Sequence, residues 1–263
     1  MIDEKEIEAL TRCFPAHAGI TPAHAGGWPL RLQVELEIGS ELFVTRFMRM
    51  GDRRGEVVLA LERPSGRLLL HRKAHYGDDT YRLLTGGIGH DEAIAAAAVR
   101  ESAEETGLEV EIRRLVAVID STLRFGDIRL PFVSYVLHVV EAGGQLSADS
   151  HEVAGFREVL PGDLPSIAEQ LRAIPGERGY WGRWRAVAHA FLPTRHSCES
   201  RNPSGWQFMR ACQMDSCQLV IPAKAGIHDT VGLFIVKYRS SPVIPAKAGM
   251  TVRSFCGQVA SPY

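Results

Sequence analysis

Three glutamates near residue 100 are the side chains whose types and spacing are best suited to chemistry. Glu101, Glu104 and Glu105 lie in the last part of a segment with helical character that ends at Gly107. Like charges three and four residues apart repel one another on a helix, and the negative end of the helix dipole disfavours further anions. Clustered carboxylates bind hard divalent cations. We therefore expect a cation on this face of the helix rather than a merely solvated charged surface.

The sequence predicts where this helix starts, packs and ends. Asp91 and Glu92 suit its start, because negative charge is favoured at a helix N-terminus. The run Ala93–Val99 is rich in helix formers, and Gly107 suits the end. Helical spacing predicts a packing face made of Ile94, Ala95, Ala98, Val99 and Ser102. Ala97 is expected on the neighbouring stripe, with the glutamates, open to a site.

Two features beside the helix complete the candidate site. Glu92 lies two turns before Arg100 and is expected to form an ion pair with it. The stretch Gly86–Gly89 is expected to turn tightly and to bring its backbone close to a ligand.

The spacing of these residues resembles the Nudix box, the signature of the Nudix hydrolases. The matching positions are Gly86, Glu92, Arg100, Glu101, Glu104, Glu105, Gly107 and Leu108. Ser102 departs from the pattern, because the family usually has an aliphatic residue there. Outside the strict pattern, Thr85 and Gly89 stand where many members have Gly and Glu. Gly89 removes one carboxylate, which leaves the number of bound ions open.

The resemblance implies hydrolysis of a nucleoside diphosphate linked to another moiety, with Mg²⁺ or Mn²⁺ as cofactor. It implies metal ligation by Glu101, Glu104, Glu105 and the backbone carbonyl of Gly86. Glu101 is also a candidate base, and Arg100 would orient Glu101 or pair with Glu92. Glu92 and Gly107 would have supporting roles.

An extra acid is expected from a later loop, where Glu152 is the candidate ligand or base and an ordinary loop acid is the equal alternative. Arg72, Lys73 and His75 are candidates for phosphate contact, or simply a solvated strand end.

The substrate is predicted only as a class. ADP-ribose, a nucleotide sugar and a nucleoside triphosphate all remain candidates, since no second signature outside the box selects one. The alternative function is a non-catalytic, Nudix-like nucleotide-sensing module, against which the intact glutamates argue.

Composition excludes several other functions. The chain has 263 residues, of which 45% are hydrophobic, enough for a substantial core. A net charge of -1 gives no electrostatic basis for binding nucleic acid or a membrane, so a small-molecule nucleotide is the expected partner. The acidic N-terminus does not resemble a signal peptide and no segment is long enough to span a membrane, so a cytoplasmic location is expected. A homodimer is left open.

The ends of the chain differ in composition from its middle. Residues 1–27 contain PAHAG repeats and are expected to be irregular, residues 28–192 to form the Nudix domain, and residues 193–263 to be a low-complexity, disordered tail. The sequence VIPAKAG recurs at 220–226 and 243–249, which favours a translated bacterial DNA repeat over the alternative, a true interaction tail. The apolar stretch 231–238 is a possible strand. All five cysteines lie in the two ends, which argues against a disulfide framework.

The middle of the chain predicts an α+β fold, a mixed β-sheet between helices. Strands are expected at 30–37, 42–48, 55–61, 67–71, 81–84, 109–120, 130–140 and 156–160, and further helices at 163–173 and 181–191. Trp181, Trp184, Val187 and Phe191 are expected in the core. This arrangement is also the α/β/α sandwich that the Nudix resemblance implies.

Overall fold

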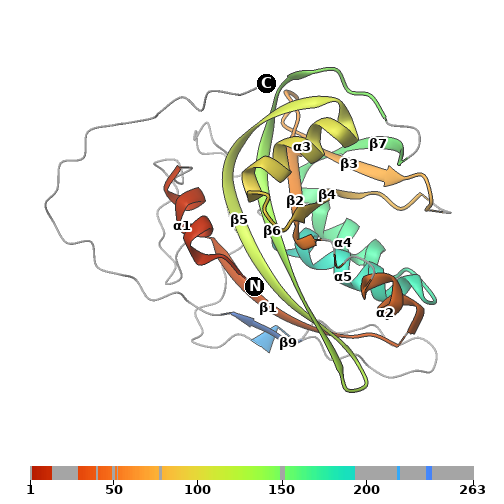
Figure 1. The fold of residues 1–263 in the computed structure, drawn as a ribbon. Helices are drawn as coiled ribbons and strands as arrows, with labels where there is room; N and C mark the ends of the chain where they lie inside the picture. The colour runs from red at the N-terminus through yellow and green to blue at the C-terminus, as the bar shows by residue number, and fades with distance from the viewer. Residues whose placement is uncertain are drawn as a thin grey trace, which may run out of the picture.

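The computed structural model describes residues 2–13, 29–39, 41–48, 51, 53–76, 79–148, 152–192, 218–219 and 235–238 (Figure 1). Its helices are α1 (Glu4–Cys13), α2 (Glu41–Met48), α3 (Ile94–Thr106), the 3₁₀ turn η1 (Pro161–Asp163), α4 (Leu164–Arg172) and α5 (Arg178–Phe191). Its strands are β1 (Leu30–Glu37), β2 (Arg53–Glu62), β3 (Leu68–Lys73), β4 (Arg82–Gly89), β5 (Leu108–Phe125), β6 (Ile128–Gly144), β7 (Val153–Val159), β8 (Gln218–Leu219) and β9 (Ile235–Tyr238).

These strands form one mixed sheet in the order β7-β3-β4-β2-β6-β5-β1-β9-β8. The pairs β2–β6 and β1–β5 are parallel, and the other pairs are antiparallel. β5 and β6 form a long hairpin that lies beside both β1 and β2. The central position of β2, between β4 and β6, places the glycines of β4 next to the middle of the sheet.

Helices cover both faces of this sheet. In β2, Val57 and Leu59 belong to the core cluster that includes α1 and α3, whereas Val58 and Ala60 belong to the cluster that includes α2, α4 and α5. This alternation is the period of two of a strand with apolar contacts on both faces. Figure 1 shows α3 on one side of the strands and α4 and α5 on the other. The predicted α/β/α sandwich is confirmed.

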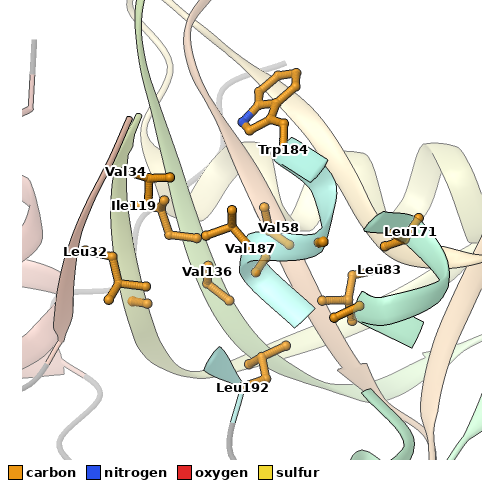
Figure 2. Packing of buried hydrophobic residues seen from close by; sticks show 14 of the residues in the cluster. Leu32, Val34, Val58, Leu83, Ile119, Val136, Leu171, Trp184, Val187 and Leu192 are labelled. Atoms are coloured by element: carbon orange, nitrogen blue, oxygen red, sulfur yellow. The ribbon is translucent and has the colours of Figure 1, made fainter. Parts of the chain in front are cut away.

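Aromatic side chains from distant segments fill the α2–α4–α5 side of the core. The ring of Trp184 on α5 makes edge contacts with those of Phe47 on α2 and Phe132 on β6, at centroid distances of 5.6 Å and 5.2 Å. Figure 2 shows Trp184 and Val187 among the buried residues of this cluster. Both were predicted to be core residues. Trp181 is only partly buried and packs against the same cluster.

The helix α3 ends where the sequence predicted and begins slightly later. Gly107 adopts a left-handed conformation with φ of 71°, and its N–H donates to the carbonyl of Ala103. Only glycine takes such a φ at little cost, so this residue ends the helix. Asp91 lies in a turn before the helix, and Ala93 is the N-cap residue.

Two predictions about the faces of α3 are wrong. Ala97 is fully buried rather than open to a site, and Val99 is 46% exposed rather than packed. The buried face of α3 is therefore defined by Ile94, Ala97 and Ala98. It is rotated about the helix axis by about one residue from the predicted face. Ser102 is buried as expected, and its hydroxyl donates to the carbonyl of Ala98.

Three predicted elements also differ from the structure. Residues 42–48 form the helix α2 rather than a strand, because Val44 and Phe47, three residues apart, bury one helical face. The stretch Gly86–Gly89 is the end of the strand β4 rather than a tight turn, because it pairs with β2. Residues 1–27 are not irregular throughout, since α1 buries Ile7 and Leu10 in the core.

The tail is partly described. The strand β9 pairs with β1 across residues 32–35 and with β8, in agreement with a strand in the apolar stretch 231–238. The PAHAG and VIPAKAG repeats and most of 193–263 lie outside the described residues, so the disorder of the tail stays a prediction. Within the described part of the chain, no helix is both long and apolar enough to cross a membrane.

Candidate active site

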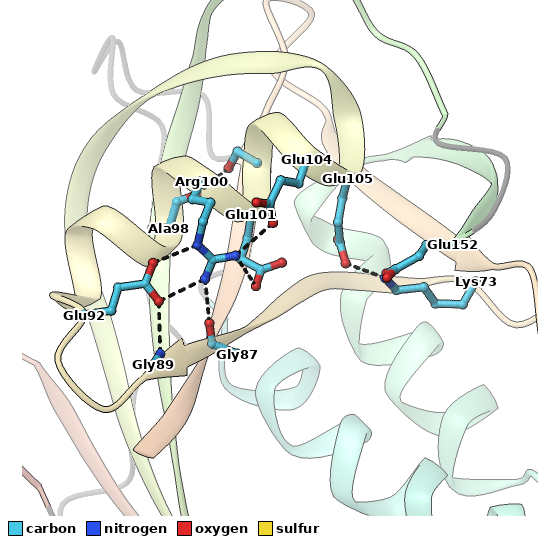
Figure 3. A network of polar contacts seen from close by, with 11 residues as sticks. Lys73, Gly87, Gly89, Glu92, Ala98, Arg100, Glu101, Glu104, Glu105 and Glu152 are labelled. Carbon is cyan, nitrogen blue, oxygen red and sulfur yellow. Dashed lines mark hydrogen bonds and ion pairs between the residues drawn. The ribbon is translucent and has the colours of Figure 1, made fainter. Parts of the chain in front are cut away.

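The guanidinium of Arg100 is the centre of the glutamate site. Its Nη1 donates to Glu101 Oε1 at 2.9 Å and to Glu104 Oε2 at 2.8 Å. Its Nε donates to Glu92 Oε1 at 2.7 Å, which confirms the predicted ion pair. These four residues, Glu92, Arg100, Glu101 and Glu104, are called the Arg100 cluster (Figure 3).

The strand β4 and the turn after it position Arg100 through the backbone. Nη2 of Arg100 donates to the carbonyl of Gly87 at 2.9 Å, and the N–H of Gly89 donates to Glu92 Oε2 at 3.0 Å. The hydrogen bond from Arg100 lowers the pKa of Glu92, and the same bond raises the pKa of Arg100. Glu92 and Arg100 therefore stay charged and tie the helix to the strand.

Glu101 is held in a space that only glycine leaves open. A Cβ on Gly86 would lie 1.9 Å from the carboxyl carbon of Glu101, so any other residue at 86 would displace this side chain. Burial raises the pKa of Glu101, Arg100 opposes that effect, and the charges of Glu105 and Glu104 add to it. A carboxylate in these surroundings is stabilised by added positive charge.

The third glutamate, Glu105, faces a different set of partners. It is 5% exposed, and its Oε1 accepts a hydrogen bond from Lys73 Nζ at 2.6 Å, while Oε2 lies 3.0 Å from Nδ1 of His71. Lys73 also donates to Glu152 Oε2 at 2.6 Å. The residues His71, Lys73, Glu105 and Glu152 are called the Lys73 cluster, and Figure 3 shows Glu105 directed toward Lys73 and away from Arg100.

Burial and charge have opposing effects in the Lys73 cluster. Burial lowers the pKa of His71 to about 4, so its ring is neutral at pH 7. Burial alone would raise the pKa of Glu105, but its contacts with His71 and Lys73 lower it to about 2. Burial alone would likewise lower the pKa of Lys73, but Glu105 raises it. Glu105 and Lys73 are therefore a buried ion pair at neutral pH.

The structure brings together two of the three glutamates predicted as metal ligands. Glu101 and Glu104 already share one cationic group, Arg100 Nη1, so their carboxylates fit a hard cation in charge and spacing. Glu105 is turned toward Lys73 instead. Within the described ranges, no three His, Cys, Asp or Glu side chains are grouped closely enough to hold a metal ion.

Sequence reasoning missed His71 and named Lys73 only as a possible phosphate contact. His71 lies in LLLHRK, where a polar residue follows a run of fully buried leucines. The signal available in the sequence was a histidine that directly follows an apolar run of three leucines. Glu152, predicted as a ligand or base, has a side chain that is 67% exposed and contacts Lys73.

An arginine and aromatic cluster lies next to the Lys73 cluster. The rings of Tyr76 and Trp181 make an edge contact at 5.0 Å, and the guanidinium of Arg178 lies 4.9 Å and 5.1 Å from their centres. Nε of Arg82 donates to the hydroxyl of Tyr76 at 2.8 Å. Burial and the charges of Lys73, Arg82 and Arg178 lower the pKa of His75.

A comparison with protein families agrees with the Nudix box. Residues 52–180 match the NUDIX domain family. No curated protein matched the chain. Among solved structures, a UDP-X diphosphatase is 16% identical over 71% of each chain, with a TM-score of 0.30. A MutT structure, from work on Aliivibrio salmonicida and Vibrio cholerae, is 18% identical over 43% of this chain and 82% of that one, with a TM-score of 0.33. The E. coli ORF135 protein is 22% identical over 44% and 81%, with a TM-score of 0.32.

The class of protein follows from the domain match rather than from these structural neighbours, whose TM-scores are low. The match spans β2 to the start of α5 and contains both clusters. The chain carries a NUDIX domain and belongs to the Nudix hydrolases. In general terms it is a Nudix pyrophosphohydrolase.

Proposed function

We propose that this protein cleaves the pyrophosphate bond of a nucleoside diphosphate joined to another moiety, using Mg²⁺ or Mn²⁺. The observation that carries the proposal is the convergence of Glu101 and Glu104 on one cationic nitrogen, beside the space left by Gly86. A bound divalent cation would neutralise phosphate charge and lower the pKa of a coordinated water.

Glu101 is proposed as a ligand and as the base for the attacking water. Its carboxylate is mostly buried, and burial raises its pKa, which makes it a better proton acceptor than an exposed glutamate. Arg100 orients it from one side, and the backbone of β4 limits it from the other. Glu104 is more exposed, with 58% of its side chain accessible, and is proposed as a ligand.

Glu105 and Gly86 are proposed as further ligands, the latter through its carbonyl. To bind a metal ion, Glu105 would first have to give up its ion pair with Lys73. Because Lys73 is shared with Glu152, its charge keeps one carboxylate partner when Glu105 turns away. The structure therefore favours Glu152 as the partner of Lys73 over Glu152 as the base.

Nucleotide recognition is proposed at the arginine and aromatic cluster. Arg178 lies against two aromatic rings, a setting that orders a guanidinium for contact with phosphate or a planar base. The candidate substrates are ADP-ribose, a nucleotide sugar and a nucleoside triphosphate. All three combine a planar base with a pyrophosphate.

A panel of these nucleotides, incubated with Mg²⁺ or Mn²⁺, tests the proposal through release of phosphate or nucleoside monophosphate. Glu101→Gln and Glu104→Gln are each expected to lower kcat by at least about 10²-fold, because each removes a ligand or base. Glu111→Gln is the matched control, since Glu111 is exposed on β5 and pairs with Arg113. Wild-type rates in either site variant would contradict the assignment.

A non-catalytic nucleotide-sensing module is the second candidate. It predicts that the same panel contains a ligand that binds tightly but is not turned over with either metal. Isothermal titration of the panel members separates this outcome from the absence of any binding.

A further inference from the structure

The N-terminal helix α1 makes a polar contact with the helix that carries the glutamates. Oε1 of Glu6 accepts a hydrogen bond from the backbone N–H of Ile94, the first residue of α3, at 2.5 Å. The other oxygen, Oε2, accepts from Nη2 of Arg54 at 2.8 Å. Both side chains are mostly buried, with 19% and 16% exposure.

This contact supplies what α3 lacks. The first N–H groups of any helix have no partner within the helix, and they are usually satisfied by a side chain just before it. The N-cap residue Ala93 makes no side-chain cap, and α3 has no acidic residue in its first turn. Glu6 therefore provides, from a distant segment, both the hydrogen-bond acceptor and the negative charge that this helix end favours.

The same contact continues into the Arg100 cluster. Arg54, the partner of Glu6, also donates to the carbonyl of Glu92 at 2.6 Å through Nη2. The carboxylate of Glu92 in turn holds Arg100. A short series of contacts thus runs from α1 to the guanidinium that orients Glu101.

Core contacts and an N-terminal cap hold α1 in place. Ile7 and Leu10 are 2% and 7% exposed and belong to the same core cluster as α3. The side chain of Asp3 accepts hydrogen bonds from the N–H groups of Lys5 and Glu6 and so caps α1. These residues lie outside the region that matches the NUDIX family, which begins at residue 52.

We propose that Glu6 is a positioning residue for the active site. Through Ile94 and Arg54 it fixes the N-terminal end of α3, and thereby the orientation of Arg100 and Glu101. The helix α1 is thus part of the catalytic unit rather than an appendage. The activity arm of the proposal rests on the proposed hydrolase function.

Hydrogen exchange tests the cap without any substrate. In the full-length chain, Glu6→Ala is expected to speed exchange of the amides in the first turn of α3 about tenfold, the factor that corresponds to one lost cap. Glu8→Ala is the matched control, because Glu8 is exposed on the same helix. Unchanged protection of these amides in Glu6→Ala would overturn the proposal.

A rescue variant distinguishes positioning from general stability. Ala93 has the extended backbone of an N-cap residue, with φ of -71° and ψ of 145°, and it is exposed, so Ala93→Asp supplies a local cap. Glu6→Ala is expected to lower kcat about tenfold with KM changed less than about twofold, and the double variant to recover most of that loss. Equal kcat values in Glu6→Ala and the unmodified chain, or a loss that Ala93→Asp fails to recover, would overturn the positioning role.

The hydrogen-exchange and kinetic experiments test this proposal and the proposed function separately. If the unmodified chain turns over no member of the panel, the hydrolase assignment fails. The cap is then accepted or rejected on the exchange of the α3 amides alone.

Discussion

Glu101 and Glu105 are one helical turn apart on α3, yet the structure gives them opposite surroundings. Glu101 belongs to the Arg100 cluster, where the cation is 38% exposed and is shared by three carboxylates. Glu105 belongs to the Lys73 cluster, where both members of the ion pair are at most 10% exposed. A ligand can compete for Glu101 and Glu104 more easily than for Glu105. Two neighbouring carboxylates of one motif thus differ in how easily a ligand can reach them. The difference comes from residues on β3 rather than from the motif itself.

Removing one cation at a time gives the strongest test of this comparison. Lys73→Met leaves Glu105 as a buried charge without its cation, so it is expected to destabilise the fold by about 3–5 kcal/mol. Arg100→Gln is expected to lower the free energy of unfolding by less than about 1 kcal/mol, because its ion pairs are partly exposed. Its main expected effect is a lower kcat, because Arg100 orients Glu101. Urea unfolding at pH 7 measures both variants. Similar stability losses at the two positions would show that the clusters do not differ as described.

The pH dependence of stability sharpens the comparison, because the buried glutamate Glu105 and the buried histidines affect stability in different pH ranges. The pKa of Glu105 is lowered to about 2, so its contribution is complete above about pH 4.5 and is lost only as the pH falls toward 2. His189 on α5 behaves in the opposite range. Its Nε2 accepts from the N–H of Leu83, and burial lowers its pKa to about 3.

His189 is therefore expected to make the protein less stable as the pH falls below about 6.5. In that range the unfolded chain binds a proton that the folded chain excludes, so stability decreases by about 2 kcal/mol between pH 7 and pH 5. His189→Leu removes this group and is expected to reduce the slope by that amount, whatever its effect at pH 7. Urea midpoints at several pH values measure the slope. An identical slope in the two proteins would contradict the buried, neutral state of this ring.

The sequence predicted the Arg100 cluster more completely than the Lys73 cluster, for a physical reason. Arg100, Glu101 and Glu104 lie on one helix and Glu92 lies just before it, so these four residues are close in sequence as well as in space. Glu105 on α3 meets Lys73 and His71 on β3 only through the tertiary fold, and no local sequence pattern encodes these contacts. The prediction treated all three glutamates alike because their spacing is alike.

Other differences between prediction and structure have the same origin. The strand β1 was predicted with its observed bounds because its apolar and polar residues alternate. Residues 42–48 were mistaken for a strand, since Val44 and Phe47 fit a helical face only once a neighbouring surface is known. The cap that Glu6 provides for α3 joins residues 88 positions apart, and no spacing rule connects them.

The smallest expected effect is at the arginine and aromatic cluster, beyond the Lys73 cluster. Arg178→Ala is expected to raise KM about five- to tenfold with kcat nearly unchanged, because stacking and cation–π contacts contribute about 1–2 kcal/mol to binding rather than to the chemical step. Arg183→Ala is the matched control, since Arg183 lies on the same helix over a different ring, that of Tyr180. Steady-state kinetics on the best substrate of the panel measures both. A fall in kcat without a change in KM would place Arg178 with the catalytic glutamates. The proposed division, with substrate binding near the Lys73 cluster and the chemical step near the Arg100 cluster, would then be wrong.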